Sequence, residues 1–334
     1  MMKVLVTGAT SGLGRNAVDF LLAKGVSVVA TGRNLAAGRE IERCGAKFVP
    51  CDLSALDLKT GMALVYGVDA VWHCAALSAP WGRAADFIAC NVTATENLLA
   101  AAVAAGVSRF VHVSTPAIYF DFRHLYDVPE TFRARHHVNA YAATKARSEE
   151  AVLASAAANH GTLHVMLRPR AIFGPHDAAL IPRVQRVLAE RGGRLPLPRA
   201  GRAVIDVTYV ENVLHAMWLA STVPNLESGS VFNITNGDPR EIGSVLKTLF
   251  TGYLGLAVDI RPVPYWAAAC AAGMMEAISL ITRREPALTR YSVGALSFDM
   301  TLDISKVRKA LGYAPVVGIE EGIARTAEWM RCHG

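Results

Sequence analysis

The stretch "KVLVTGATSGLGRNAVDFLLAKG" (3–25) decides the fold of this chain. It opens with a run of β-branched and apolar residues typical of a buried strand, and it closes with a helical pattern that ends at Gly25. Gly8, Gly12 and Gly14 stand at the junction. Glycines there let a phosphate approach the backbone at the N-terminus of a helix, where free N–H groups and the helix dipole favour an anion. The stretch predicts a dinucleotide-binding turn; a tight turn without a ligand is the alternative.

The alternation of strand and helix continues to residue 169. Helical stretches such as 91–106 separate most of the apolar runs. Continuous apolar strands linked by helices indicate a parallel sheet covered on both faces. We therefore expect an α/β fold, with a Rossmann doubly wound parallel sheet and a smaller C-terminal substrate-binding lobe. Further strands are expected at 26–31, 46–52, 69–76, 108–115 and 163–169.

The pattern loosens after residue 173 into loops rich in proline and glycine. We predict that 1–173 form the dinucleotide-binding Rossmann domain. A strand and a helix within 203–232 are expected to return to it. The ranges 174–202 and 233–334 then form the substrate-binding lobe.

Composition excludes several classes of protein. With 52% hydrophobic and 19% charged residues, the 334-residue chain is globular and not disordered. The net charge of +6 comes without a dense block of Lys or Arg, so we expect no nucleic-acid partner.

Six scattered cysteines without a CxxC pair predict reduced thiols in a cytoplasmic protein, and the histidine spacings predict no metal. The apolar segment 263–281, interrupted by Glu276, predicts a buried or membrane-facing amphipathic helix, and hence peripheral membrane contact as a further expectation.

The end of the second strand bears on the choice of cofactor. The sequence there is "ATGRN" (30–34), which has no carboxylate to bond the adenosine ribose 2′-OH. Arg33 has a guanidinium that can make two charge-assisted hydrogen bonds to a 2′-phosphate. We therefore predict NADP(H) over NAD(H); the alternative is that Arg33 only solvates the start of a helix.

The stretch "NAYAATKARSEE" (139–150) places Tyr141 and Lys145 one helical turn apart, on the same face. A free phenol has a pKa of about 10, which is too high for efficient proton exchange near neutrality. A neighbouring ammonium favours the phenolate and lowers that pKa. The pair therefore predicts an acid–base site, with an accidental surface pair as the alternative.

Four segments agree in order and spacing: "TGATSGLG" (7–14), "CDL" (51–53), "VST" (113–115) followed by "YAATK" (141–145), and "RPRAIFGP" (168–175). Together they resemble the extended branch of the short-chain dehydrogenase/reductase superfamily. The stretch 285–323 is similar to the 3β-hydroxysteroid dehydrogenase-like group, which includes sterol dehydrogenases and bacterial 2-alkyl-3-oxoalkanoate reductases. One departure is the GxxxGxG glycine spacing, because extended members usually have GxxGxxG.

The resemblance implies roles for individual residues. Tyr141 is the proposed general acid, and Lys145 holds the nicotinamide ribose as well as favouring the phenolate. Thr115 would donate to the substrate carbonyl, and the adjacent Ser114 could share that role. Cofactor contacts are implied for Gly8, Thr10, Ser11, Gly12, Leu13, Gly14, Arg33, Asp52, Leu53, Ala75, Ala76, Asn91, Val113, Tyr141, Lys145, Pro169, Ala171 and Ile172.

The leading hypothesis is an NADP(H)-dependent oxidoreductase that interconverts an apolar ketone and its secondary alcohol. The ketone would be a β-keto acid or a sterol-like compound. One alternative is an NAD-dependent nucleotide-sugar epimerase or dehydratase, and another is a non-catalytic dinucleotide-sensing protein. The resemblance also implies a homodimer formed through 91–106 and the Tyr141 helix.

Overall fold

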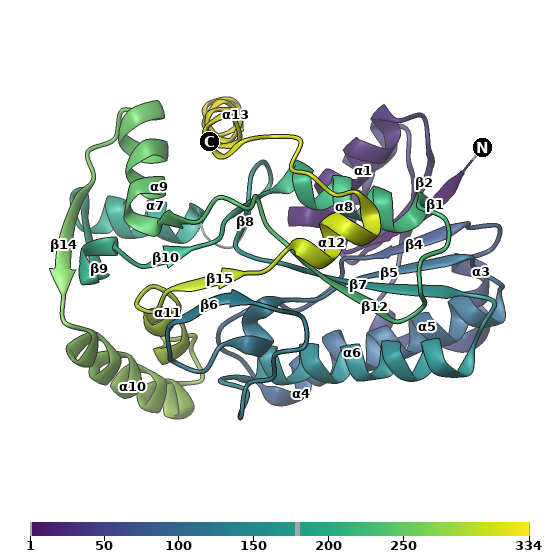
Figure 1. Cartoon of the computed structure of the whole chain (residues 1–334), viewed down its shortest axis with the longest axis horizontal. Helices are drawn as coiled ribbons and strands as arrows, with labels where there is room; N and C mark the ends of the chain where they lie inside the picture. The colour runs from purple at the N-terminus through teal and green to yellow at the C-terminus, as the bar shows by residue number, and fades with distance from the viewer. Residues whose placement is uncertain (1, 178–180, 334) are drawn as a thin grey trace.

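The computed structural model describes residues 2–177 and 181–333. A layered α/β body occupies one side of the molecule, and a smaller lobe of helices and short strands packs against it (Figure 1). The chain begins in the body, and the last helix returns to the top of the molecule between the two parts.

The body is built on a seven-stranded parallel sheet with the order β12-β7-β5-β4-β1-β2-β3. This order and the flanking helices confirm the predicted doubly wound α/β fold. The strands are β1 (Lys3–Thr7), β2 (Ser27–Gly32), β3 (Lys47–Pro50), β4 (Ala70–His73), β5 (Arg109–Val113), β7 (Leu163–Pro169) and β12 (Ser230–Ile234).

Helices cover both faces of this sheet because its strands are apolar on both sides. Val4 and Val6 of β1 face a core shared with α1, α8 and α12, whereas Leu5 between them faces a core shared with α3, α5 and α6. The helices are α1 (Gly12–Ala23), α2 (Leu35–Arg43), α3 (Leu58–Leu64), α4 (Ala84–Phe87), the π-helical turn η2 (Ile88–Thr93), α5 (Ala94–Ala104), α6 (Ala140–Ala158), α8 (Val210–Thr222) and α12 (Ser305–Leu311).

The lobe contains a four-stranded sheet with the order β13-β10-β15-β6 and the parallel pair β9 and β14. Its strands are β6 (Leu125–Val128), β9 (Arg194–Pro198), β10 (Val204–Ile205), β13 (Arg240–Glu241), β14 (Asp259–Val263) and β15 (Met300–Leu302). Its helices are α7 (Ile181–Glu190), α9 (Ile242–Lys247), the π-helical turn η5 (Thr248–Tyr253), α10 (Tyr265–Thr282), α11 (Arg290–Ala295) and α13 (Ile319–His333). Short elements complete the chain: the pair β8 (Ile172–Phe173) and β11 (Thr208–Tyr209), and the 3₁₀ turns η1 (Leu53–Ala55), η3 (Pro116–Tyr119) and η4 (Arg199–Gly201).

The predicted boundaries between the two parts need correction. β6 lies inside the range 1–173 but pairs with β15 of the lobe. The strand expected near residue 203 is β10, which also pairs within the lobe, and the strand that returns to the main sheet is β12. Ile304 to Tyr313, assigned to the lobe, pack into the main core beside α8. The chain crosses between the parts several times, and linear sequence order does not reveal such crossings.

Within the part of the chain that the structure describes, two helical segments are long and apolar enough to cross a membrane, judged by length and composition only. In the first, Ala84–Ala104, half of its most apolar 18-residue window is buried inside the protein. In the second, α10, only 17% of the residues are buried. The segment predicted at 263–281 is therefore a helix on the outside of the lobe.

Candidate functional site

The glycine turn after β1 has the shape that a bound pyrophosphate requires. Gly14 approaches Gly8 so closely that a Cβ would lie 2.2 Å from the Gly8 carbonyl oxygen. Gly12 has a φ of +52°, and no atom lies within 4 Å of the place where its Cβ would stand. Ser11 precedes α1 without a side-chain hydrogen bond to the helix N-terminus, and the Thr10 side chain lies against Gly32. The turn therefore leaves open space beside helix N–H groups, which fits a dinucleotide phosphate.

The ends of β2 and β3 place Arg33 near Asp52. Arg33 is exposed, and its positive charge lowers the pKa of Asp52, after the larger effect of the hydrogen bonds from Ser54. The Asp52 carboxylate accepts 3.0 Å and 2.7 Å hydrogen bonds from the backbone N–H and hydroxyl of Ser54. Leu53 is buried, so its side chain belongs to the core. Arg33 keeps its guanidinium on the surface at the edge where the resemblance places the adenosine.

The loop after β4 is held beside the glycine turn. The Ala75 N–H donates a 3.1 Å hydrogen bond to the Thr7 hydroxyl, and Ala76 follows on the surface. Asn91, in the π-helical turn η2, accepts a 2.7 Å bond from the Leu77 N–H and donates to the Thr144 hydroxyl at 3.1 Å. Asn91 therefore fixes this loop against α6 through its hydrogen bonds with Leu77 and Thr144.

Tyr141 and Thr115 lie together at the carboxyl end of β5. Hydrogen bonds with Thr115 and Ser78 lower the pKa of the Tyr141 phenol, but burial has the larger effect and raises it. The Thr115 hydroxyl also accepts a 3.2 Å bond from the Ala117 N–H. The Ser114 hydroxyl is buried without a hydrogen-bond partner among the described residues. The geometry therefore favours Thr115 over Ser114 as the partner of Tyr141.

Lys145 is 1% exposed, and its ammonium lies against β5. Its ammonium donates a 2.7 Å hydrogen bond to the Val113 carbonyl oxygen and lies 3.1 Å from His112 Nε2. Burial lowers the pKa of Lys145 to about 8, and the Glu149 carboxylate opposes that shift. Lys145 is not among the groups that shift the pKa of Tyr141 in this structure. The pKa lowering expected from the sequence is therefore a proposal for the cofactor-bound protein.

A buried ion pair fixes α6 against the sheet. Arg168 on β7 donates a 2.8 Å hydrogen bond from Nε to Glu149, and a second nitrogen also bonds this carboxylate. Glu149 follows Lys145 by one helical turn. Removing either partner of such a pair leaves an uncompensated buried charge, so the pair holds α6 in one position.

The segment after β7 passes close to the same edge of the sheet. Pro169 ends β7 and Ala171 has a φ of +43°, an uncommon conformation for a residue other than glycine. Thr208 holds this turn: its N–H bonds the Ala171 carbonyl oxygen at 3.1 Å and its hydroxyl bonds the Arg170 carbonyl oxygen. Ile172 then pairs with Thr208 in the short β8–β11 sheet. The turn that should contact the nicotinamide is thus held rigidly.

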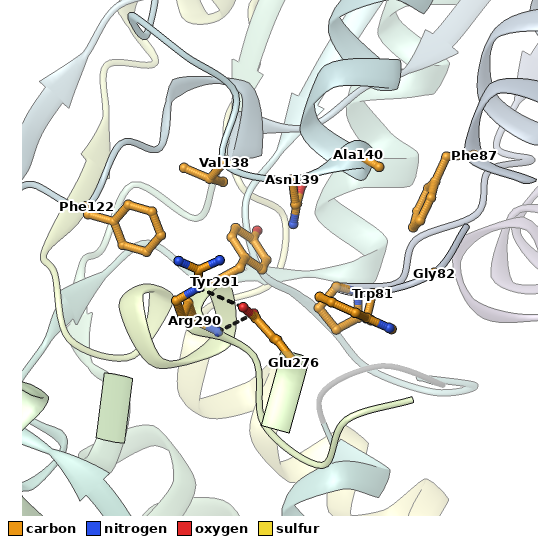
Figure 2. Close-up of a pocket in the computed structure, with 11 residues that line it drawn as sticks. Trp81, Gly82, Phe87, Phe122, Val138, Asn139, Ala140, Glu276, Arg290 and Tyr291 are labelled. Carbon is orange, nitrogen blue, oxygen red and sulfur yellow. Dashed lines mark hydrogen bonds and ion pairs between the residues drawn. The ribbon is translucent and has the colours of Figure 1, made fainter. Parts of the chain in front are cut away.

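A cavity of about 290 Å³ lies between the start of α6 and the lobe helices α10 and α11 (Figure 2). Phe122 and Val138 form one side of it, and Trp81 and Phe87 form the other. Tyr291 stands between them and influences the pKa of Tyr141.

Polar groups of the cavity come from both parts of the molecule. Glu276 of α10 accepts 2.8 Å and 2.7 Å bonds from the backbone N–H and Nε of Arg290 (Figure 2). Asn139 caps α6 through its side-chain oxygen, and its amide nitrogen is buried without a partner among the described residues. The arrangement combines apolar walls with a few polar groups next to a tyrosine, as small-molecule sites usually do.

Sequence reasoning missed most of the residues around the cavity and Tyr141, among them the polar residues Ser78, Asn139, Glu276, Arg290 and Tyr291. Asn139 had a detectable signal, because it stands at the N-cap position of the Tyr141 helix. The other four come from a loop and from lobe helices whose approach to the site depends on the tertiary fold. Met274 and Met275 lie on the exposed side of α10 and do not line the cavity. Among the described residues, no group of three or more His, Cys, Asp or Glu side chains is placed to hold a metal ion.

A sequence model described as the NAD dependent epimerase/dehydratase family matches residues 4–235. The chain belongs to this family. It is a member of the extended short-chain dehydrogenase/reductase class, so it is an NAD(P)-dependent oxidoreductase at that level of description.

Relatives align along nearly the whole chain. The uncharacterized protein YbjS of Escherichia coli (strain K12) is 47% identical, covering 100% of this chain and 99% of its own. The 4-hydroxy-2-methyl-3-oxo-4-farnesyl-3,4-dihydroquinoline-1-oxide ketoreductase of Stigmatella aurantiaca is 36% identical, covering 96% and 95%. The 2-alkyl-3-oxoalkanoate reductase of Stenotrophomonas maltophilia (strain K279a) is 34% identical, covering 97% and 98%.

The yeast sterol-4-alpha-carboxylate 3-dehydrogenase ERG26 is 31% identical over 85% of this chain and 83% of its own. These relatives confirm the resemblance to the group of sterol dehydrogenases and oxoalkanoate reductases. Among solved structures, MoeE5 in complex with UDP-glucuronic acid and NAD has a TM-score of 0.76 and 25% identity, with 99% of each chain covered.

Proposed function

We propose that this protein is an NADP(H)-dependent reductase or dehydrogenase that interconverts an apolar ketone and its secondary alcohol. The candidate substrates are a β-keto acid and a sterol-like ketone. The observation that carries the proposal is Tyr141 hydrogen-bonded to Thr115 next to a cavity with aromatic walls. A dinucleotide bound at the glycine turn supplies the hydride for the carbonyl carbon.

The side chains of the chain supply the proton and the orientation. Tyr141 gives its phenolic proton to the carbonyl oxygen as that oxygen gains negative charge, and takes it back in the oxidative direction. Thr115 donates a hydrogen bond to the same oxygen and holds the carbonyl in place. Lys145 turns from Val113 to the cofactor ribose, where its charge favours the phenolate. Hydride and proton together convert the ketone to the alcohol.

Arg33 supports the choice of NADP(H). Its exposed guanidinium stands at the end of β2, where no carboxylate follows the strand to bond a ribose 2′-OH. Asp52 is nearby, but it is the N-cap of η1 and accepts hydrogen bonds from Ser54. Arg33 is therefore the charged group available to a 2′-phosphate.

Two other functions are weighed against this one. A nucleotide-sugar epimerase or dehydratase has the same fold, as MoeE5 with its UDP-glucuronic acid illustrates. The apolar walls and the higher identity to the ketoreductase and the oxoalkanoate reductase favour an apolar ketone. A purely dinucleotide-sensing protein would not need the Tyr141, Lys145 and Thr115 set.

A substrate screen tests the proposal. Purified protein is mixed with NADPH or NADH and with 2-alkyl-3-oxoalkanoates, steroid ketones or aromatic ketones, and the loss of reduced cofactor absorbance is followed. We expect turnover of at least one apolar ketone, with NADPH preferred. Turnover of a UDP-sugar without net redox, together with co-purified NAD⁺, would instead establish the epimerase function.

We also propose a cytoplasmic homodimer whose α10 rests on a membrane surface. The dimer interface proposed from the family lies along α5 and α6, and a monomer in light scattering would contradict it.

The membrane contact is proposed from the surface of α10. Apolar side chains are exposed there at helical spacing, and two arginines follow on the surface: Trp266, Met274, Ile278 and Ile281, then Arg283 and Arg284. An apolar face bordered by basic residues complements an anionic bilayer surface.

A further inference from the structure

Arg170 is a buried cation that has no hydrogen-bond or ion-pair partner among the residues that the structure describes. The residue is 8% exposed, and its Nε is buried without a hydrogen-bond partner among the described residues. Within residues 2–177 and 181–333, the guanidinium makes neither a hydrogen bond nor an ion pair within 4 Å. Burying a charge without such partners is costly, so an arginine of this kind needs an anion to complete its surroundings.

The backbone around Arg170 is held firmly, so the side chain is presented from a fixed position. Its N–H donates a 3.1 Å hydrogen bond to the Ile234 carbonyl oxygen, and its own carbonyl oxygen accepts from the Thr208 hydroxyl at 2.5 Å. The nearby Asp206 is already bonded to the Leu302 N–H at 2.7 Å. Asp206 therefore acts on the Arg170 guanidinium only through its charge. It forms no hydrogen bond or ion pair with it.

The position of Arg170 points to the substrate and not to the cofactor phosphates. Arg170 follows β7, and β7 pairs directly with β5, whose end carries Thr115. The glycine turn follows β1, which lies three strands away in the sheet order, a separation of about 14 Å. Tyr291, which lines the cavity, influences the pKa of both Arg170 and Tyr141. Arg170 and Tyr141 therefore both lie close enough to Tyr291 to be influenced by its charge.

The other cations near the cavity are already occupied. Arg290 is paired with Glu276, and Lys145 donates to the Val113 carbonyl oxygen. Arg170 is therefore the cation that the described residues leave for a ligand. A planar guanidinium can hold a carboxylate through two parallel hydrogen bonds.

We propose that Arg170 binds the carboxylate of an anionic substrate and so places the adjacent carbonyl at Tyr141 and Thr115. The ligand class is an apolar 3-oxo or 3-hydroxy carboxylic acid, with its alkyl part against Trp81, Phe87 and Phe122. This inference rests on the proposed function but adds a requirement that the reductase hypothesis does not make, namely that the carboxylate be charged.

The test compares a 2-alkyl-3-oxoalkanoate with its methyl ester, which has the same carbon skeleton and no charge. We expect the wild type to prefer the acid, mainly through a lower KM. In Arg170→Met, the ratio of kcat/KM for the acid to kcat/KM for the ester should fall about 10- to 150-fold. This is the factor that corresponds to the free energy of one charge-assisted hydrogen bond. Arg170→Lys restores part of that ratio. Arg191→Met, which removes one exposed arginine, leaves the ratio unchanged.

A binding measurement keeps the inference separate from turnover. Titration of the protein with a 2-alkyl-3-hydroxyalkanoate should show binding to the wild type and much weaker binding to Arg170→Met, even if no ketone is reduced. Equal carboxylate binding by the two proteins, or an acid-to-ester ratio that Arg170→Met does not change, contradicts the inference. Loss of NADPH affinity in Arg170→Met would assign Arg170 to the cofactor instead. If the wild type reduces neither the acid nor the ester, the proposed function is refuted. The measurement of carboxylate binding still decides the role of Arg170 in that case.

Discussion

At the scale of single residues, Lys145 shows a conflict between function and stability. Its ammonium is buried on β5, and its pKa falls from 10.5 to about 8. The difference corresponds to ~3 kcal/mol of destabilisation when the lysine is charged. Hydrogen bonds to Val113 and His112, each worth about 1 kcal/mol, offset part of it. Lys145 therefore lowers the stability of the fold, and the chemical role proposed for it gives a reason for a lysine at this position.

We predict that Lys145→Met is inactive but more stable than the wild type by about 1 kcal/mol at neutral pH. Because the folded-state pKa lies below the unfolded-state value, the unfolded chain binds more protons between about pH 8 and pH 10.5. The destabilisation is complete below pH 8, and wild-type stability rises with pH through this window. The advantage of the variant should therefore disappear toward pH 10.5.

Urea unfolding of both proteins across this pH range measures the effect. Lys59→Met, a change at an exposed lysine of α3, is the matched control. An Lys145→Met protein that is less stable than the wild type at neutral pH would show that the buried ammonium is well compensated.

Arg33 carries the prediction on cofactor choice. Replacing it by Ala should weaken NADPH binding by about 10- to 150-fold, the value of a charge-assisted hydrogen bond, and leave NADH binding within a few-fold. Arg43→Ala, which removes an exposed arginine at the far end of α2, the helix that follows Arg33, is the control. Fluorescence titration gives both Kd values. Equal or tighter NADH binding by the wild type would refute the NADP(H) preference.

At the scale of secondary-structure elements, the sequence predicted the features that depend on interactions between residues close together in the chain. The glycine turn, the Tyr141–Lys145 spacing and six strands of the main sheet depend on neighbouring residues, so the sequence revealed them. Tyr291 and Glu276 lie far along the chain from Tyr141, and only the packing of α10 and α11 brings them to the cavity. His112 stood inside a predicted strand, but its contact with Lys145 depends on the register of α6 over β5.

The helix α10 connects two surfaces of the lobe. Its inner side contributes Glu276 to the cavity, and its outer side exposes Leu280 and Ile281, which are 73% and 85% exposed. This position offers an apolar substrate a route from a bilayer to the cavity, if α10 rests on the membrane as proposed.

We predict that the protein co-sediments with vesicles containing an anionic phospholipid and much less with neutral ones. Ile281→Glu should weaken that binding about tenfold, because it removes one buried apolar side chain from the interface. Tyr66→Glu changes an equally exposed apolar residue of the main domain and should have no effect. Concentration-dependent self-association that Ile281→Glu abolishes would show that a second copy, and not a membrane, covers α10.

At the scale of the whole molecule, the proposed reaction needs both parts of the fold. The seven-stranded sheet brings the glycine turn and Thr115 to one edge, and α10 and α11 of the lobe contribute Glu276, Arg290 and Tyr291 to the cavity at the start of the Tyr141 helix. The sequence predicted this division but misplaced its boundaries. β6 and α12 show why: each pairs or packs with residues from the other part, and no local pattern signals such an exchange.

The most direct test is the reduction of a 2-alkyl-3-oxoalkanoate by Tyr141→Phe, measured as NADPH oxidation. Tyr66→Phe removes the same hydroxyl from a surface residue and serves as the control. We predict that Tyr141→Phe loses about 10²- to 10⁴-fold in kcat, while its Kd for NADPH stays within a few-fold of the wild type. A Tyr141→Phe enzyme that reduces the ketone as fast as Tyr66→Phe would contradict the account.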